Sequence, residues 1–162
     1  MKPMHIGILR TDSVSREWVS TYGEYPDMFT RLLSAEDDAL TFTTWNVEVG
    51  ELPNSVEAAD GFLITGSRSS VYDDKAWIRA LEDFVRECHA ARSKVIGICF
   101  GHQLVAQALG GVVAKSPNGW GVGVNCYTVD RENFDLADGE QFCLLASHQD
   151  QVMTMPPGAT KI

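Results

Sequence analysis

The stretch VIGICFGHQLVAQALGG, residues 95–111, joins an apolar strand to a helix through a corner rich in glycine. Residues 95–98 are all apolar or glycine, without alternation, which is typical of a central parallel strand buried on both faces. A helix is predicted to follow at once and to end at Gly110 and Gly111. The sequence therefore places Cys99 between the end of a strand and the first turn of a helix.

Strands and helices alternate on the N-terminal side of this stretch. The patterns predict strands over 4–9, 40–47 and 61–65, and helices over 26–33 and from residue 73 to about 88. Such alternation with short connections predicts an α/β fold with a mainly parallel central sheet flanked by helices. After residue 112, alternation over 121–129 and an apolar run over 141–146 predict antiparallel strands in the C-terminal part.

The size and charge of the chain exclude several classes of protein. Its 162 residues, 44% hydrophobic and 22% charged, fit a single globular domain over residues 1–162. A net charge of −9 repels phosphate backbones and anionic lipids, so neither nucleic acid nor a membrane is an expected partner. Because no secretory leader or spanning segment is recognisable, a cytoplasmic location is expected.

The four cysteines, Cys88, Cys99, Cys126 and Cys143, are well separated in the sequence. They form no C-x-x-C pair and have no histidine at ligand spacing, so neither a metal nor another cofactor is expected. A disulfide framework is not expected either, because a chain of this size does not need one and the cytosol would reduce it.

The segment from Gly97 to Gly101 has the spacing of a nucleophile elbow, a sharp turn from strand to helix that exposes its central side chain. Glycine at both ends avoids collisions between neighbouring backbone segments. At a helix N-terminus, the unpaired N–H groups would favour a Cys99 thiolate and could stabilise an oxyanion. The same five residues also fit an inert cysteine at a glycine corner, so both interpretations remain open at this point.

Three further segments extend the pattern. They are GFLITGSRSSVYDD at 61–74, NGWGVG at 118–123 and ASHQDQV at 146–152, and the elbow itself continues as far as Gln103. Together, and in this order, they resemble the class I (triad-type) glutamine amidotransferases. The chain is most similar to stand-alone domains that resemble the amidotransferase half of GMP synthetase. The resemblance spans most of the chain and implies a flavodoxin-like α/β fold.

The resemblance implies a role for each matched residue. Cys99 would attack the γ-carboxamide of glutamine, while the backbone N–H groups of Gly66 and Phe100 hold the oxyanion. Ammonia would leave, and water would release glutamate from a γ-glutamyl thioester. The substrate's amide and its α-amino and carboxylate groups are expected to be held by Gln103, Ser147, His148 and Gln149. Besides this small-molecule substrate, an ammonia-accepting synthetase is the candidate partner.

The family's catalytic histidine belongs to a His-Pro-Glu segment, which this sequence does not contain. His102, which follows the elbow, and His148, in the pocket segment, are the candidate bases that remain. We expect a structural hydrogen bond for His102, and the family's equivalent of His148 is not its catalytic histidine. His5 and His89 are expected to be structural. Because the sequence stops in MPPGATKI, at what resembles the start of a strand, we expect a domain truncated at its C-terminus that lacks its base.

Two other functions remain open. The first is a hydrolase of γ-glutamyl peptides or amines, which would use the same nucleophile and thioester. The second is a non-catalytic or inactive form of the fold, favoured by the missing histidine and disfavoured by the presence of Cys99, Gly66 and Gln103. Arg68, just after Gly66, is a further candidate for contact with a substrate carboxylate.

Overall fold

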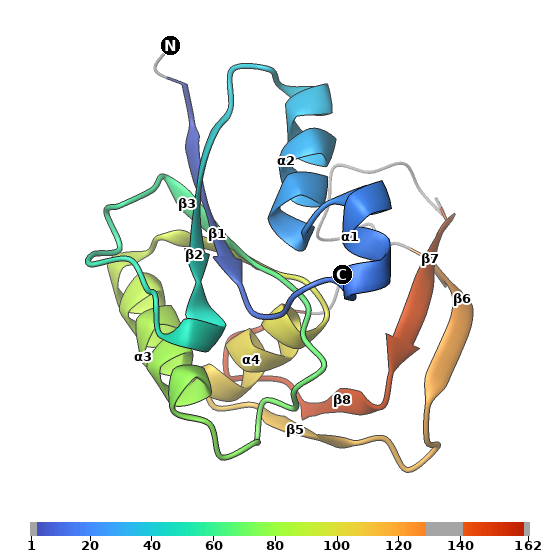
Figure 1. Ribbon diagram of the computed structural model, residues 1–162. Coiled ribbons are helices and arrows are strands. Elements are labelled where there is room, and N and C mark those ends of the chain that lie inside the picture. The colour runs from blue at the N-terminus through green and yellow to red at the C-terminus, as the bar shows by residue number, and fades with distance from the viewer. Residues whose placement is uncertain (1–2, 129–140, 161–162) are drawn as a thin grey trace.

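A parallel four-stranded sheet forms the centre of the computed structural model, which describes residues 3–128 and 141–160 (Figure 1). Its strands are β1 (His5–Arg10), β2 (Thr41–Asn46), β3 (Gly61–Ile64) and β4 (Lys94–Gly97), in the order β2-β1-β3-β4. All three neighbouring pairs are parallel. The expected α/β fold with a parallel central sheet is therefore confirmed.

The register of the sheet brings three chain segments to one edge. Leu9 of β1 pairs with Ile64 of β3, which in turn pairs with Gly97 of β4. The residues that follow these strands therefore leave the sheet side by side. In open α/β sheets, ligands bind beyond this carboxyl edge.

Four helices in the described part of the chain accompany the sheet, and the last two of them supply most of the buried helical residues. They are α1 (Arg16–Tyr22), α2 (Tyr25–Glu36), α3 (Ala76–Ala91) and α4 (Phe100–Ala108), with a short 3₁₀ helix at Val47–Val49. The apolar residues of α3 between Ile78 and Cys88 form a buried stripe. The ring centroids of Phe84 and of Phe62 on β3 lie 5.1 Å apart, edge to face. Helix α1 was not expected, because none of its residues is buried and its sequence shows no apolar stripe.

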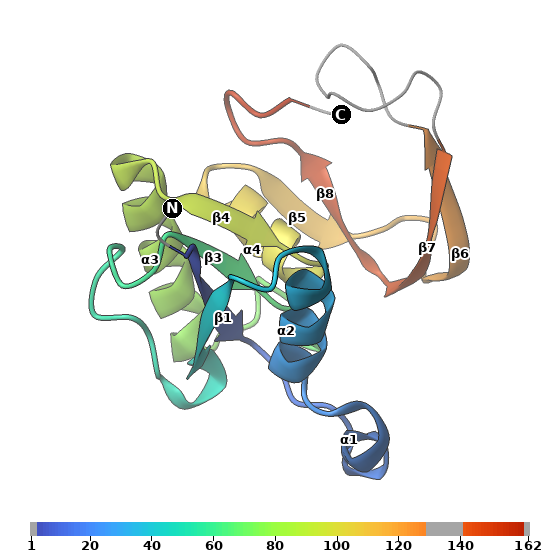
Figure 2. The ribbon, with the colours of Figure 1, turned by 90° about the horizontal axis from the view of Figure 1, so that it is seen from above.

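The C-terminal part contains two antiparallel strand pairs, of which only the second was predicted from the sequence. Strand β5 (Val112–Lys115) pairs with β8 (Asp150–Thr154), and β6 (Gly121–Thr128) pairs with β7 (Gln141–His148). Both views place the β6–β7 ribbon outside the four-stranded sheet, beyond β5 and β8 (Figures 1 and 2). Residue 129, the last of one expected strand, lies outside the described residues. None of the described helices is long and apolar enough to cross a membrane.

The position expected for β4 was wrong. The strand lies at the edge of the described sheet, and the side chain of Ile96 is 58% exposed. Val95 packs against the core, whereas Lys94 and Ile96 on the other face are exposed. An unbroken apolar run therefore does not by itself show that both faces of a strand are covered.

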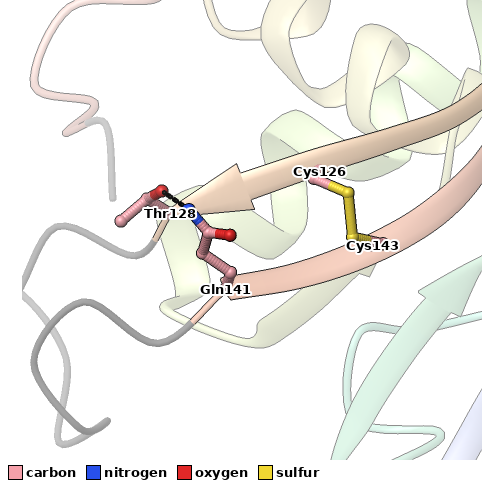
Figure 3. Close-up of a disulfide and its surroundings, with 4 residues drawn as sticks. All are labelled: Cys126, Thr128, Gln141 and Cys143. Atoms are coloured by element: carbon pink, nitrogen blue, oxygen red, sulfur yellow. Dashed lines mark hydrogen bonds between the residues drawn. A yellow bond between two sulfur atoms is a disulfide. The ribbon is translucent and has the colours of Figure 1, made fainter.

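The expectation that the cysteines form no disulfide was also wrong, for one pair. Cys126 of β6 and Cys143 of β7 form a disulfide across the ribbon (Figure 3). The two residues are direct partners in the antiparallel register, where side chains on one face lie close together. That register could not be read from two cysteines separated by 17 residues in the sequence. Cys88 and Cys99 are free.

Candidate active site

Cys99 occupies a strained corner between β4 and α4. It is the N-cap residue of α4, with φ 52° and ψ −105°, and it is exposed. A non-glycine residue rarely adopts positive φ, and such strain persists only where the surroundings hold it. The chain thus presents this cysteine above the carboxyl edge of the sheet, as the elbow pattern predicted.

The two flanking glycines make this corner sterically possible. A Cβ atom at Gly97 would lie 2.5 Å from the carbonyl oxygen of Gly101, and one at Gly101 would lie 2.5 Å from the carbonyl oxygen of Ile64. Real Cβ atoms essentially never come within 3.0 Å of such neighbours. Both positions therefore require glycine for the close packing of α4 on β3 and β4.

Two backbone N–H groups near Cys99 have no acceptor within the described part of the protein. Gly66 follows β3, and a Cβ atom built on it would lie only 3.6 Å from the Cys99 Cβ atom. Within the described residues, the N–H groups of Gly66 and Phe100 donate to no protein acceptor. The Phe100 N–H also belongs to the first turn of α4, where the helix dipole favours a negative charge.

A cavity of about 330 Å³ lies beside this corner. Five of the seven residues predicted for the site line it, namely Cys99, Gln103, Ser147, His148 and Gln149. The turn after β3 supplies another wall through residues 67–70, and Lys115 and Trp120 complete the rim. The fold therefore gathers segments as far apart in the sequence as residues 67–70 and 147–150 around one thiol.

Gln103 is already bonded to the protein. Its side chain is buried, and its Nε2 donates to the backbone carbonyl of Asp150 at 2.9 Å. Its side-chain carbonyl oxygen makes no hydrogen bond with the described residues. Gln103 therefore also fixes the start of β8 against α4.

Asp150 is a second anchor of the cavity wall, which the sequence analysis did not single out. Its two carboxylate oxygens accept hydrogen bonds from Ser70 Oγ at 2.6 Å and from Tyr72 Oη at 2.8 Å. These bonds fasten the turn after β3 to β8. The acidic residue within ASHQDQV was the available signal, but the pattern did not reveal its partners.

Arg68 faces the cavity but is held by another residue. Its Nε and Nη2 donate to the two carboxylate oxygens of Asp12, at 3.0 and 2.7 Å. Burial alone would raise the pKa of Asp12, but the hydrogen bonds from Arg68 and from the Ser13 N–H outweigh it and lower that pKa. The guanidinium expected to contact a substrate carboxylate is thus paired with a carboxylate of the protein.

No hydrogen bond joins a histidine side chain to the Cys99 sulfur in the described part of the chain. His148 lines the cavity and His102 lies on α4, yet within the described residues neither side chain hydrogen-bonds Cys99 Sγ. Desolvation lowers the pKa of His102; a hydrogen bond to the Cys99 backbone opposes this shift, and the proximity of His148 adds a smaller lowering. His5 bonds Thr41 at the opposite end of the sheet, and His89 lies in the last turn of α3.

The chain resembles several known proteins over most of its length. It is 32% identical to a glutamine amidotransferase-like protein of Schizosaccharomyces pombe, over 95% of this chain and 67% of that one. It is 34% identical to gamma-glutamyl peptidase 4 of Arabidopsis thaliana, over 86% of this chain and 58% of that one. A glutamine-hydrolysing GMP synthase of Pyrobaculum aerophilum is 33% identical over 64% of this chain and 19% of its own.

The fold is shared with a solved structure. The glutamine amidotransferase of Methylobacillus flagellatus superposes with a TM-score of 0.74 and 26% identity, over 98% of this chain and 59% of that one. The chain spans 58% of the length of the Arabidopsis thaliana peptidase and 67% of the length of the Schizosaccharomyces pombe protein. A family model described as glutamine amidotransferase class-I matches residues 22–162, and the chain therefore belongs to that family.

Proposed function

We propose that this domain cleaves the γ-amide of glutamine through a covalent intermediate on Cys99. The observation that carries the proposal is the exposed, strained cysteine at the N-terminus of α4, with two unpaired backbone N–H groups beside it. A cavity opens at the same point, so a small substrate has access to the sulfur. Strain, access and anion-stabilising groups in one place are what a nucleophile requires.

In the proposed reaction, Cys99 Sγ forms a bond to the γ-carbon of the substrate. The carbonyl oxygen becomes an oxyanion that accepts hydrogen bonds from the N–H groups of Gly66 and Phe100. Collapse of this intermediate breaks the carbon–nitrogen bond and releases ammonia, with the proton from the thiol. Water then hydrolyses the thioester to glutamate and restores the thiol. Each oxyanion donor contributes about 10²–10³-fold in rate in comparable sites.

Binding of the substrate is assigned to the remaining cavity wall. We assign the γ-amide to the free carbonyl oxygen of Gln103, and the α-amino and carboxylate groups to the backbone of Ser147, His148 and Gln149. The position of these residues around the cavity that contains Cys99 supports this assignment.

We further propose that the proton acceptor for Cys99 is a His-Glu pair in a continuation of the chain past residue 162. Two observations support it: no described histidine bonds the sulfur, and the plant peptidase extends well beyond the matched length. The domain would then be a truncated part of a longer protein. The test is the encoding gene together with the activity of the longer product, which should exceed that of residues 1–162.

The activity is measured as glutamate released from glutamine. We expect Cys99→Ser to reduce the rate by at least about a thousand-fold, because loss of a nucleophile removes the covalent route. Cys88→Ser is the matched control, since Cys88 is the other free cysteine and is buried in the core. A Cys99→Ser variant that retains the activity would overturn the proposal.

A second candidate substrate is a γ-glutamyl peptide, which would form the same thioester and release an amine. The relatives named gamma-glutamyl peptidase favour it, because the plant protein is 34% identical over most of this chain. Comparing kcat/KM for glutamine and for a γ-glutamyl dipeptide separates the two. If glutamine is preferred, a synthetase that accepts ammonia is the partner to seek. If the longer product hydrolyses neither compound, the non-catalytic form of the fold is favoured.

A further inference from the structure

Two buried polar residues follow β1 at the carboxyl edge of the sheet, outside the mechanism described above. The residues are Thr11, fully buried, and Asp12, 4% exposed. The β1–β3 register places them beside the turn that carries Gly66. Buried polar groups are costly unless they are hydrogen-bonded, and both residues have several hydrogen-bond partners.

Thr11 contacts the carbonyl groups of the peptides before and after Gly66. Its Oγ1 lies 3.0 Å from the carbonyl oxygens of both Thr65 and Gly66, and its backbone N–H donates to Thr65 Oγ1 at 3.0 Å. The Thr11 hydroxyl therefore lies within hydrogen-bond distance of the two carbonyl groups that flank Gly66 and of the Thr65 hydroxyl. The orientation of a peptide N–H is fixed when the carbonyl of the same peptide plane is fixed.

Asp12 holds the other side of the turn. Its Oδ2 accepts a hydrogen bond from the backbone N–H of Arg68 at 2.7 Å, in addition to the bond from Arg68 Nε, while Oδ1 accepts the bond from Nη2. The N–H of Ser13 also donates to Asp12, at 2.7 Å to Oδ1. The carboxylate is therefore held in place and in turn holds the backbone two residues after Gly66.

We propose that Thr11 and Asp12 are positioning residues that orient the turn 65–68 so that the Gly66 N–H faces the Cys99 corner. This inference rests on the proposed function, because it assigns the Gly66 N–H to the oxyanion. The hydrogen bond from the Gly66 N–H forms only when negative charge develops on the substrate oxygen. Disturbing the turn should therefore affect a carbonyl reagent bound as glutamine is, and leave simple alkylation of the thiol unchanged.

The test compares two reagents on the same protein. One is a chloroketone analogue of glutamine, whose ketone takes the place of the amide carbonyl; the sulfur–carbon bond forms as chloride and the thiol proton leave. The other is iodoacetamide, which alkylates the thiol without an oxyanion. We expect Asp12→Asn to slow inactivation by the chloroketone by about 10–100-fold, and to leave iodoacetamide alkylation of Cys99 within about twofold of the unmodified rate.

Three further variants locate the effect. Arg68→Ala removes the guanidinium but retains the backbone N–H bonded to Asp12, so its chloroketone rate should fall less than about threefold. Thr11→Val removes the hydroxyl at similar volume and should slow the chloroketone reaction, whereas Thr11→Ser should restore it. If Asp12→Asn and Thr11→Val leave the chloroketone rate unchanged, or slow both reagents equally, the positioning role is wrong. An unmodified protein that does not react with the chloroketone would overturn the proposed function itself.

Discussion

At Cys99, the backbone conformation and the two neighbouring glycines depend on one another. The positive φ of Cys99 is held by α4, and α4 approaches β3 closely only because Gly101 has no side chain. This dependence could be predicted from the residues 97–101 alone. The bonds of Asp12 and Asp150 could not, because each joins residues more than fifty positions apart in the sequence.

Gly101→Ala should therefore destabilise the protein and disturb the site together. The new methyl group would lie 2.5 Å from the Ile64 carbonyl oxygen, so α4 must move. We expect a loss of about 1–3 kcal/mol in the free energy of unfolding, measured with denaturant. Gly121→Ala is the control, since its methyl group would make an ordinary contact of 3.5 Å with His148. Equal stability of the two variants would contradict this account of the corner.

Asp12 predicts a dependence of stability on pH. Its pKa is lower in the folded protein than the ordinary value of 3.8, so the unfolded chain binds a proton more readily. The stabilisation is therefore complete above pH 3.8 and is lost as the pH falls through the folded pKa. We expect Asp12→Asn to be less stable by about 1–3 kcal/mol at pH 7, and the difference to shrink at pH 3. A difference that stays constant or grows on acidification would argue against this role of the carboxylate.

At the scale of the elements, apolar periodicity predicted what packs against the core and missed what does not. Helix α3 was predicted because its buried residues recur in the sequence at helical spacing. Helix α1 was missed because it contributes nothing to the core. The exposed face of β4 shows the converse limit, since its apolar sequence indicated two covered faces. Buried polar links between elements carry no periodic signal, and Glu82 provides an example.

Glu82 of α3 links α4 to the turn after β3. Its buried carboxylate accepts hydrogen bonds from Arg79 at 2.8 and 2.9 Å and from Gln107 of α4 at 2.7 Å. Both donors also bond the carbonyl of Val71. We expect Glu82→Gln to lower the free energy of unfolding by about 1–3 kcal/mol, because it removes a charged acceptor from a buried network.

Asp83→Asn provides the matched control on the same helix. The Asp83 side chain is 71% exposed and pairs with Arg86 at the surface. Exposed ion pairs contribute about 0–1 kcal/mol, so this variant should unfold close to the unmodified protein. If the two variants are equally stable in denaturant, the Glu82 network does not hold the elements together as described.

At the scale of the whole molecule, the parallel sheet and the outer ribbon are stabilised in different ways. Residues of the sheet take part in a continuous apolar core, whereas Val122, Val124 and Leu145 of the ribbon remain largely exposed. The disulfide between Cys126 and Cys143 closes the ribbon (Figure 3). The sequence predicted both antiparallel strands but not their covalent link, which depends on the register between them.

Reduction of this disulfide should loosen the ribbon and leave the sheet intact. We expect hydrogen exchange of the β6 and β7 amides to accelerate by at least about tenfold, because a two-stranded ribbon is marginally stable on its own. The amides of β1 and β3 should exchange at an unchanged rate. The Cys126→Ser, Cys143→Ser double variant should behave like the reduced protein. Uniform acceleration across the sheet, or none in the ribbon, would contradict this division.

The central claim is that Cys99 is the nucleophile of a glutamine-binding site. It is tested most directly by treating the protein with the chloroketone analogue of glutamine and mapping the adduct by peptide mass spectrometry. Cys88 is the internal control, because burial raises the pKa of its thiol to about 11, and Cys126 and Cys143 are joined in the disulfide. The account predicts one adduct, on Cys99, that excess glutamine suppresses. Equal labelling of Cys88 and Cys99, or labelling that glutamine does not suppress, would contradict it.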